Sequence, residues 1–296
     1  MRVFETRIPP ELDGARVETV LRQELELSTT RIKRAKFRPD GILLDGARVN
    51  TVQTVRAGQV LRLTLPELTE SDFVPTPGEI SILYEDEWLM AVDKPAGLAM
   101  YPGPGHYADT LGNRFVWLMG QRGAKLAFRP VNRLDKGTSG ILVLAKSAEA
   151  HERLQALLHT DSFQRTYWAL TEKPPQPEQG VIDAPIGAVE GALNRYEVRP
   201  DGKPARTEYR LLRQTERAAL VELRLFTGRT HQIRVHMAHI GCPLLGDALY
   251  NSVKGFGRPM LHSRLLQLSH PFTGEVIQLQ SPVPQDFTAI LGEDVV

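Results

Sequence analysis

Residues 131–146 read VNRLDKGTSGILVLAK, and this stretch decides the fold. A turn of Gly, Thr and Ser residues is followed at once by the apolar run 141–145, which is typical of a buried strand. A turn that feeds such a strand holds its side chains firmly at the rim of a sheet. Asp135 stands in that turn, where a carboxylate can act as a covalent nucleophile. An isolated aspartate in such a turn more often only bonds its own backbone, so the rest of the chain has to decide.

Strand patterns lie on both sides of this stretch, and helical patterns are fewer. The helices are expected at 148–158, behind Ser147 as a cap, and at 232–239. The strands are expected at 80–84, 89–92, 140–145, 166–171, 206–212, 219–226, 265–268 and 276–279. This order predicts an α+β fold with a central mixed, largely antiparallel sheet flanked by helices.

The chain is expected to divide into a small first unit, 1–68, a linker, 69–79, and a large second unit, 80–296. The linker contains Ser71, Pro75, Pro77 and Gly78. In the first unit, helices are expected at 19–27 and 31–38 and strands at 41–44, 48–50 and 59–65.

The second of these helices is strongly basic. It carries no acid, and its bases are Arg31, Lys33, Arg34, Lys36 and Arg38. A solvated basic helix is common, and the competing interpretation is a helix that contacts phosphate groups. Together with the glycine turn that follows, GILLDGARV at 41–49, the helix resembles the alpha-L RNA-binding module of ribosomal protein S-four. The resemblance implies that the five bases bind RNA.

Composition excludes several classes of protein. The 296 residues are 42% hydrophobic and 24% charged, with a net charge of +1 and one cysteine, Cys242. No stretch is apolar for long enough to span a membrane, and the first residues lack the apolar centre of a secretory signal. We therefore expect a cytoplasmic protein with no membrane partner.

Four segments place functional side chains at turns beside strands. They read DKPAGL at 93–98, NRLDKGTSG at 132–140, RTYWAL at 165–170 and GRTHQIRVH at 228–236. With GCPLLGD at 241–247 and LHSRL at 261–265, they resemble in order the RluA branch of the RNA pseudouridine synthases. The resemblance implies the pseudouridine synthase fold and isomerisation of uridine in structured ribosomal or transfer RNA.

The resemblance also implies roles for the catalytic residues. Asp135 would be the nucleophile, and Tyr167 would stack on the base and assist loss of the ring proton. Arg234 would pair with Asp135, with Arg229 as the less favoured alternative. Whether the carboxylate attacks the pyrimidine ring or the sugar stays open.

The substrate would be bound by side chains around this centre. Arg133 would fill the space that a flipped nucleotide leaves in the RNA helix. Leu261 would pack against the base, and Lys94 would support the backbone or a phosphate. Arg229 and His231 complete the expected substrate-binding residues.

One position departs from the family pattern, since Asn132 stands where histidine is usual. A loop-shaping role would leave activity intact, whereas contact with RNA would alter the choice of target. We expect no cofactor, because the reaction transfers no electron, hydride or external group. No metal is expected either, although His231, His236, His239 and Cys242 are spaced closely, because no C-x-x-C or H-E-x-x-H pattern is present.

The protein is expected to be a monomer. Two other functions fit the same residues less well. A non-catalytic RNA-binding protein could keep this fold, and only Asn132 favours it. A glycoside-cleaving enzyme would use Asp135 together with a second carboxylate about 5 Å away. Asp247 is the one acid within the matching segments outside the Asp135 and Asp93 turns, and its motif looks structural.

Overall fold

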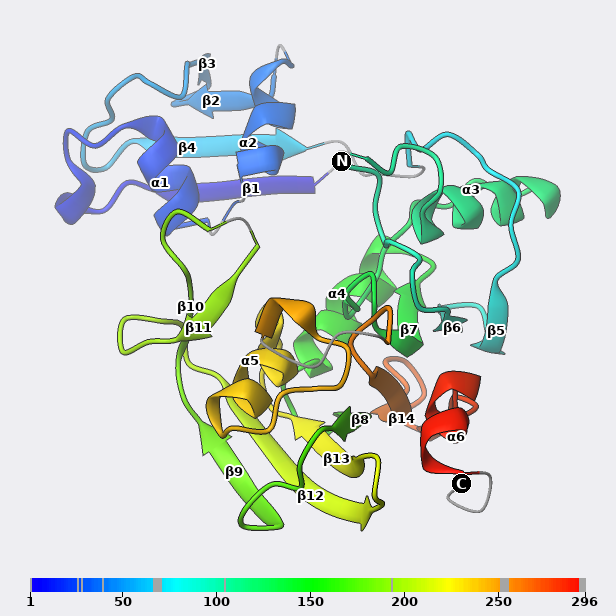
Figure 1. Cartoon of the computed structure of the whole chain (residues 1–296). Coiled ribbons are helices and arrows are strands. Elements are labelled where there is room, and N and C mark those ends of the chain that lie inside the picture. The colour runs from blue at the N-terminus through cyan, green and yellow to red at the C-terminus, as the bar shows by residue number, and fades with distance from the viewer. Residues whose placement is uncertain are drawn as a thin grey trace. The chain divides into compact units, whose positions relative to one another are not determined.

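The computed structural model describes residues 2–25, 27, 29–38, 40–65, 71–103, 105–192, 194–250 and 256–292 (Figure 1). The chain divides into two compact units, Met1–Leu68 and Thr69–Val296. The second is called the catalytic unit below. The start of the expected linker, residues 69 and 70, lies outside the described residues. No helix in the described ranges is long and apolar enough to cross a membrane.

The first unit packs two helices on a four-stranded sheet. The strand order is β1 (Arg2–Arg7), β4 (Val60–Leu65), β2 (Ile42–Leu44) and β3 (Ala47–Arg48). The helices are α1 (Val17–Gln23) and α2 (Thr29–Lys36), and a short 3-10 turn, η1 (Pro10–Leu12), precedes them. Val20, Leu21 and Ile32 pack with Leu61 and Leu63 to form its core. The first helix begins two residues before the expected start and ends at Gln23, so Leu25 and Leu27 lie beyond it.

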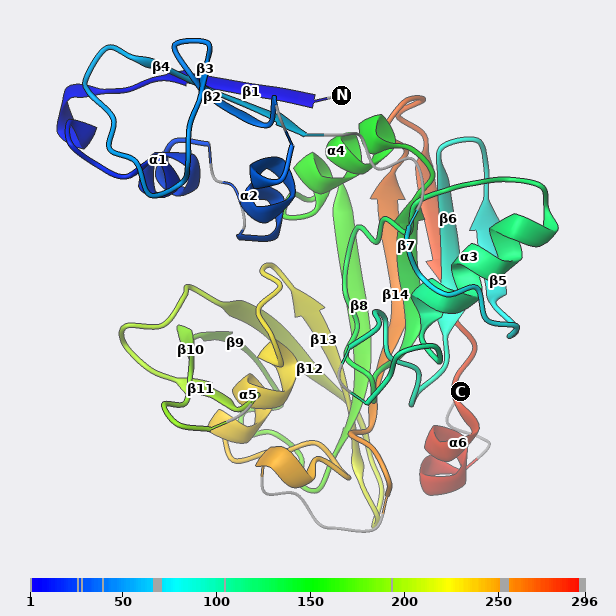
Figure 2. The same cartoon turned by 90° about the horizontal axis from the view of Figure 1, so that it is seen from above.

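A nine-stranded sheet organises the described part of the catalytic unit (Figure 2). Its order is β5 (Ser81–Glu85), β6 (Leu89–Lys94), β7 (Ser139–Ala145), β14 (Leu261–Ser269), β8 (Phe163–Thr171), β13 (Ala219–Leu225), β12 (Arg206–Gln214) and β9 (Gln179–Asp183), and β15 (Val276–Gln280) pairs with β14. Strands β7 and β14 pair in parallel, and the other pairs are antiparallel. The prediction of a mixed, largely antiparallel sheet is confirmed.

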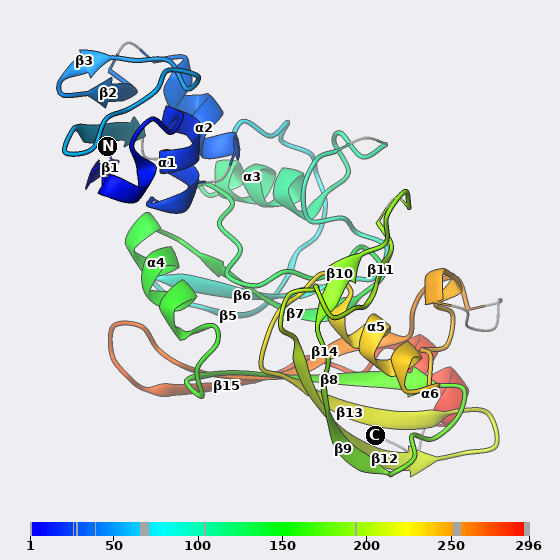
Figure 3. The ribbon, with the colours of Figure 1, turned by 90° about the vertical axis from the view of Figure 1, so that its left-hand side faces the viewer.

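Helices cover both faces of this sheet. Side chains of α3 (Leu111–Gln121) and α5 (Gln232–His239) share one apolar cluster, and Figure 3 shows both helices on the same side. Side chains of α4 (Ala148–Leu157) and α6 (Gln285–Leu291) pack with sheet residues that point the other way. A small hairpin, β10 (Ile186–Ala188) and β11 (Tyr196–Val198), and a 3-10 turn, η2 (Ala248–Tyr250), lie near α5.

The apolar run of the opening stretch becomes β7, in which every residue is buried. Leu142 and Leu144 point into one cluster, and Ile141 and Val143 point into the cluster on the opposite face. At the start of the strand, Gly140 has a φ of 107°, and a Cβ there would collide with the backbone of Ser263 in β14. Only glycine allows this approach, which joins the Asp135 turn to the centre of the sheet.

Candidate active site

Asp135 is held at the sheet rim by the residues beside it. Leu134 is buried, and its backbone N–H contacts the sulfur of Met100 at 3.1 Å. The N–H of Thr138 donates to the carbonyl of Asp135 at 3.1 Å, which closes the turn. The Asp135 side chain is 22% exposed, so the turn presents its carboxylate to solvent.

Two basic side chains, buried Lys94 and half-buried Arg258, fix the carbonyls that follow Asp135. The Nζ of Lys94 donates to the carbonyls of Pro95 and Leu98 at 2.8 and 3.0 Å, and lies 3.4 Å from the carbonyl of Lys136. The side chain is fully buried, and this burial lowers the pKa of Lys94 to about 7. The contacts are to backbone, which is one of the two roles expected for this lysine.

Arg258 holds the next carbonyl of the turn. Its Nη1 donates to the carbonyls of Gly137 and Leu261 at 3.1 and 3.2 Å. Its other nitrogens form two bonds with Asp286 in α6, at 2.6 and 2.8 Å. Nothing in the sequence singles out Arg258, because its neighbours match no motif and its contacts lie far along the chain.

Two donors face the carboxylate of Asp135. The Nη1 of Arg234 lies 3.6 Å from Oδ2, and the Nε2 of His231 lies 3.7 Å from the same oxygen. The expected neighbour, Arg234, is therefore near Asp135, but its shortest bonds run elsewhere. Its Nε and Nη2 donate to the two oxygens of Asp247 at 2.6 and 2.7 Å. Burial alone would lower the pKa of Arg234, but these bonds prevail and raise it, so the guanidinium stays charged.

Asp247 is the partner that sequence reasoning missed. It is 1% exposed, and Arg234 occupies both of its oxygens. A retaining glycoside hydrolase needs a second carboxylate that is free to act as an acid and base. Asp247 cannot readily play that part while it neutralises a buried arginine, so the site favours the use of Asp135 alone.

His231 begins α5 with a left-handed backbone, at a φ of 56°. Its Nδ1 lies 3.0 Å from the hydroxyl of Tyr250, which also accepts the N–H of Tyr196 at 3.2 Å. The hydroxyl proton is then available to Nδ1, which leaves the ring proton on Nε2, facing Asp135. Burial lowers the pKa of His231, so the neutral ring prevails at pH 7.

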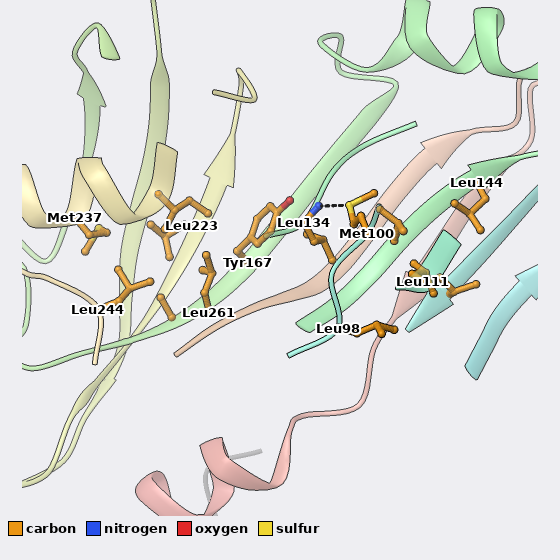
Figure 4. Packing of buried hydrophobic residues seen from close by; sticks show 14 of the residues in the cluster. Leu98, Met100, Leu111, Leu134, Leu144, Tyr167, Leu223, Met237, Leu244 and Leu261 are labelled. Atoms are coloured by element: carbon orange, nitrogen blue, oxygen red, sulfur yellow. Dashed lines mark hydrogen bonds between the residues drawn. The ribbon is translucent and has the colours of Figure 1, made fainter. Parts of the chain in front are cut away.

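The base of the site is apolar. Tyr167, in β8, is 3% exposed, and Figure 4 shows it between Leu134 and Leu223 with Leu261 beside it. Burial raises the pKa of the Tyr167 phenol. A pocket opens above these side chains, between the Asp135 turn and residues 228–234, and is called the active-site pocket. It joins one carboxylate and one aromatic ring to several arginines.

The arginines at the rim differ in exposure. Arg133 is exposed beside Asp135, and Arg229 is exposed with its Nε bonded to the carbonyl of Pro204 at 2.9 Å. Arg234 lies inside the pocket, which makes it and not Arg229 the neighbour of Asp135. The structure thus brings the expected catalytic residues, and the expected substrate residues other than Lys94, to one pocket. Lys94 instead contacts the backbone of the Asp135 turn.

Asn132 lies behind the turn. Its Oδ1 accepts the N–H of Val143 at 2.9 Å, and its Nδ2 lies 3.5 Å from the carbonyl of Ile141. The side chain is 6% exposed and fixes the turn to β7. These contacts fit the loop-shaping interpretation of the departure at this position.

The histidines of α5 are spaced for a metal but are used otherwise. His236 is fully buried, with Nδ1 2.8 Å from the hydroxyl of Thr207 and Nε2 2.9 Å from the carbonyl of Ala184. Across the described residues, no three His, Cys, Asp or Glu side chains gather as a metal would require.

The basic helix of the first unit is described in part. Lys33 and Lys36 are exposed, and Arg38 is half-buried with its Nε 3.5 Å from Asp40. The side chains of Arg31 and Arg34 lie outside the description.

Comparison with known proteins agrees with this geometry. The family described as RNA pseudouridylate synthase matches residues 88–239. Ribosomal large subunit pseudouridine synthase D of Pseudomonas aeruginosa is 36% identical over 300 residues, covering 96% of this chain and 93% of that protein. The uncharacterized RNA pseudouridine synthase YhcT of Bacillus subtilis is 36% identical over 288 residues, covering 96% and 95%. The solved structure of human RNA pseudouridylate synthase domain containing 4 has a TM-score of 0.58 at 30% identity, over 71% of this chain and 91% of that one.

Proposed function

The chain belongs to the RNA pseudouridylate synthase family, and we propose that it modifies large-subunit ribosomal RNA with Asp135 as its covalent nucleophile. An enzyme of this family is an isomerase that acts on RNA. The ribosomal target is supported by relatives that carry this target in their names, such as those of Pseudomonas aeruginosa and Nitrosomonas europaea. The observation that carries the catalytic role is a partly exposed carboxylate at a pocket with an apolar, aromatic base.

The reaction rearranges bonds within one nucleotide. The bond between N1 of uracil and C1′ of the sugar breaks, the base rotates, and a bond between C5 and C1′ forms. The proton on C5 leaves to solvent, and N1 gains one, so atoms and electrons balance without an external reactant. A carboxylate can hold either the ring or the sugar covalently while the base turns.

The neighbouring residues suit these steps. Arg234, kept charged by Asp247, faces the Asp135 carboxylate with Nη1 and helps to place it for attack. Tyr167 and Leu261 offer flat apolar surfaces to the uracil ring. Burial raises the pKa of Tyr167 and keeps its phenol neutral, so the phenol assists loss of the C5 proton as a relay that accepts this proton on its oxygen while it passes its own hydroxyl proton toward solvent. Arg133 enters the RNA helix in place of the flipped nucleotide.

The protein is also proposed to act alone. We expect a monomer in the cytoplasm. It should need no nucleotide cofactor, because the substrate and the side chains named above supply every group that the reaction uses.

The target proposal is tested by mapping pseudouridine in large-subunit ribosomal RNA from cells that lack this gene. At least one modified position should be missing. A plasmid with the wild-type gene should restore it, and one with Asp135→Asn should not. An unchanged ribosomal map, with a position lost from transfer RNA, would reject the ribosomal target.

A further inference from the structure

Arg165 is a buried cation in the active-site pocket. It lies in β8 two residues before Tyr167, so the two side chains point to the same face of the sheet. The residue is 4% exposed, and its side chain lines the same pocket as Asp135. Neither the family resemblance nor the mechanism above gives it a role.

The charge of Arg165 is poorly compensated. Within the described parts of the chain, its guanidinium forms no ion pair with a carboxylate, and its buried Nε has no hydrogen-bond partner. Its Nη2 lies 3.5 Å from the carbonyl of Leu158, which is a weak contact. The ring of Phe163 lies 5.9 Å from its carbon Cζ. These contacts replace little of the hydration that burial removes.

The surroundings add positive charge. Arg133, Arg229 and Arg234 line the same pocket, and Asp135 is the one carboxylate among its described lining residues. Burial, and then the charges of Arg165 and Arg229, lower the pKa of nearby His159, so this ring is neutral at pH 7. Gly228 lies beside Arg165, since a Cβ added to it would be in ordinary contact with Nη1 at 3.6 Å.

We propose that Arg165 binds a backbone phosphate of the RNA at the flipped nucleotide, a role that rests on the function proposed above. A flipped nucleotide enters the pocket with its own phosphates attached, and these are the anions the RNA brings. A planar guanidinium matches phosphate oxygens with two parallel bonds. A uracil carbonyl could accept one bond but would leave the charge uncompensated. The unpaired cation of the free enzyme is thus neutralised when RNA binds.

Arg165→Met tests this assignment, because it should weaken RNA binding without lowering the stability of the protein. RNA affinity should fall about 10- to 100-fold, the value of one or two bonds to a charged group. The slope of log K against log salt should shrink by about 0.7 to 0.9, which corresponds to one phosphate contact. The urea midpoint of the catalytic unit should stay the same or rise, because an uncompensated buried charge is removed. The probe is unmodified large-subunit ribosomal RNA transcribed in vitro, in filter binding from about 50 to 200 mM salt.

Two further variants sharpen the result. Arg165→Lys keeps the charge and should retain the salt slope while it recovers part of the affinity. Arg264→Met removes another buried arginine, which is 7% exposed, bonded to the carbonyl of Ser281 and placed over Trp168. It should leave RNA affinity and salt slope as in the wild type, because Arg264 does not line the active-site pocket.

Three results would overturn the assignment. Unchanged affinity in Arg165→Met would show that the RNA does not use this cation. Lower affinity with an unchanged salt slope would indicate an uncharged acceptor. A lower urea midpoint, or a variant that does not fold, would show that Arg165 stabilises the protein. Binding does not require turnover, so these outcomes are separate from a failure of Asp135 as nucleophile, which the loss or survival of product formation in Asp135→Asn reports.

Discussion

At the scale of the residue, one arginine serves two carboxylates. Arg234 bonds Asp247 through two nitrogens and turns the third toward Asp135. The bonds to Asp247 fix the plane of the guanidinium, and the looser contact leaves Asp135 free to react. The sequence identified Arg234 and Asp135, but it could not show that Asp247 holds the arginine in place.

We expect His231 to contact Asp135 through its Nε2–H. Two substitutions distinguish this contact from a role in which His231 only provides the left-handed backbone conformation. The amide nitrogen of glutamine can replace Nε2, whereas that of asparagine lies nearer the position of Nδ1. His231→Gln should therefore keep much more of the single-turnover rate than His231→Asn.

A purely conformational role predicts the reverse order. His231 has a φ of 56°, and asparagine tolerates this left-handed conformation better than glutamine does. A faster His231→Asn, with melting temperatures of both variants matched to the wild type, would contradict the proposed contact with Asp135.

Lys94 should make stability depend on pH in an unusual direction. Its pKa is about 7 in the folded protein, against 10.5 for an ordinary exposed lysine. Between these two pH values Lys94 is protonated in the unfolded chain and neutral in the folded protein. Burial of the charged lysine therefore destabilises the fold fully below pH 7, and this destabilisation decreases as the pH rises toward 10.5. The free energy of unfolding of the wild type, relative to Lys94→Met, should rise by roughly 1.4 kcal/mol for each pH unit in that window. Urea unfolding at pH 7, 8 and 9 measures it, and a flat difference would contradict a depressed pKa.

At the scale of the element, the strands that carry the site were predictable and α3 was not. Strands β7 and β13 are long apolar or alternating runs, and their periodicity is visible in the sequence. Helix α3 contains two glycines, Gly112 and Gly120, and two aromatic residues, which disfavour a helix in isolation. It forms because Leu111, Phe115 and Met119 are buried in the main core and Thr110 caps its start. Tertiary packing therefore decides this element.

The two glycines of α3 should respond in opposite ways to alanine. A Cβ on Gly112 would press on the ring of Phe73 at 2.6 Å, whereas one on Gly120 would meet nothing within 4 Å. Gly112→Ala should lower the free energy of unfolding by about 1–3 kcal/mol through overpacking. Gly120→Ala should raise it by about 0.5–1 kcal/mol through helix propensity. Urea titration of both variants provides the comparison, and a stabilising Gly112→Ala would show that Phe73 moves aside freely.

Only the residues of the site that line the pocket within recognisable segments were predictable from the sequence. Asp135 stands in a recognisable segment before a strand, Tyr167 in one within a strand and His231 in one before a helix, and the structure brings these segments together. Tyr250 and Arg258 act through hydrogen bonds to residues far away in sequence, so no local pattern marks them. Arg165 opens one of these segments, but the sequence suggested no role for it, because burial without a partner is visible only in three dimensions.

At the scale of the whole molecule, the chain joins a small basic unit to a catalytic unit. Each has its own apolar core. The net charge of +1 is too small to hold RNA by itself, so binding has to rest on local clusters of bases. The exposed lysines of α2 and the arginines of the active-site pocket are two such clusters.

The lysines of α2 should contribute phosphate contacts. Lys33→Glu should weaken RNA binding and reduce the slope of log K against log salt by about 0.7 to 0.9. Arg56→Glu makes the same change of charge at an exposed loop of the same unit and serves as the control. Equal effects of the two variants in filter binding would mean that only net charge matters, and no effect of Lys33→Glu would remove α2 from the RNA-binding surface.

The most direct test of the proposed chemistry is tritium release from RNA labelled at carbon five of uridine. Rejoining of the base through that carbon displaces the label, so release reports the isomerisation. The wild type should release tritium from unmodified large-subunit ribosomal RNA. Asp135→Asn, which keeps the shape of the side chain but not its charge, should bind the RNA and release none. Release by Asp135→Asn at a rate near that of the wild type would contradict the assignment of Asp135 as the nucleophile.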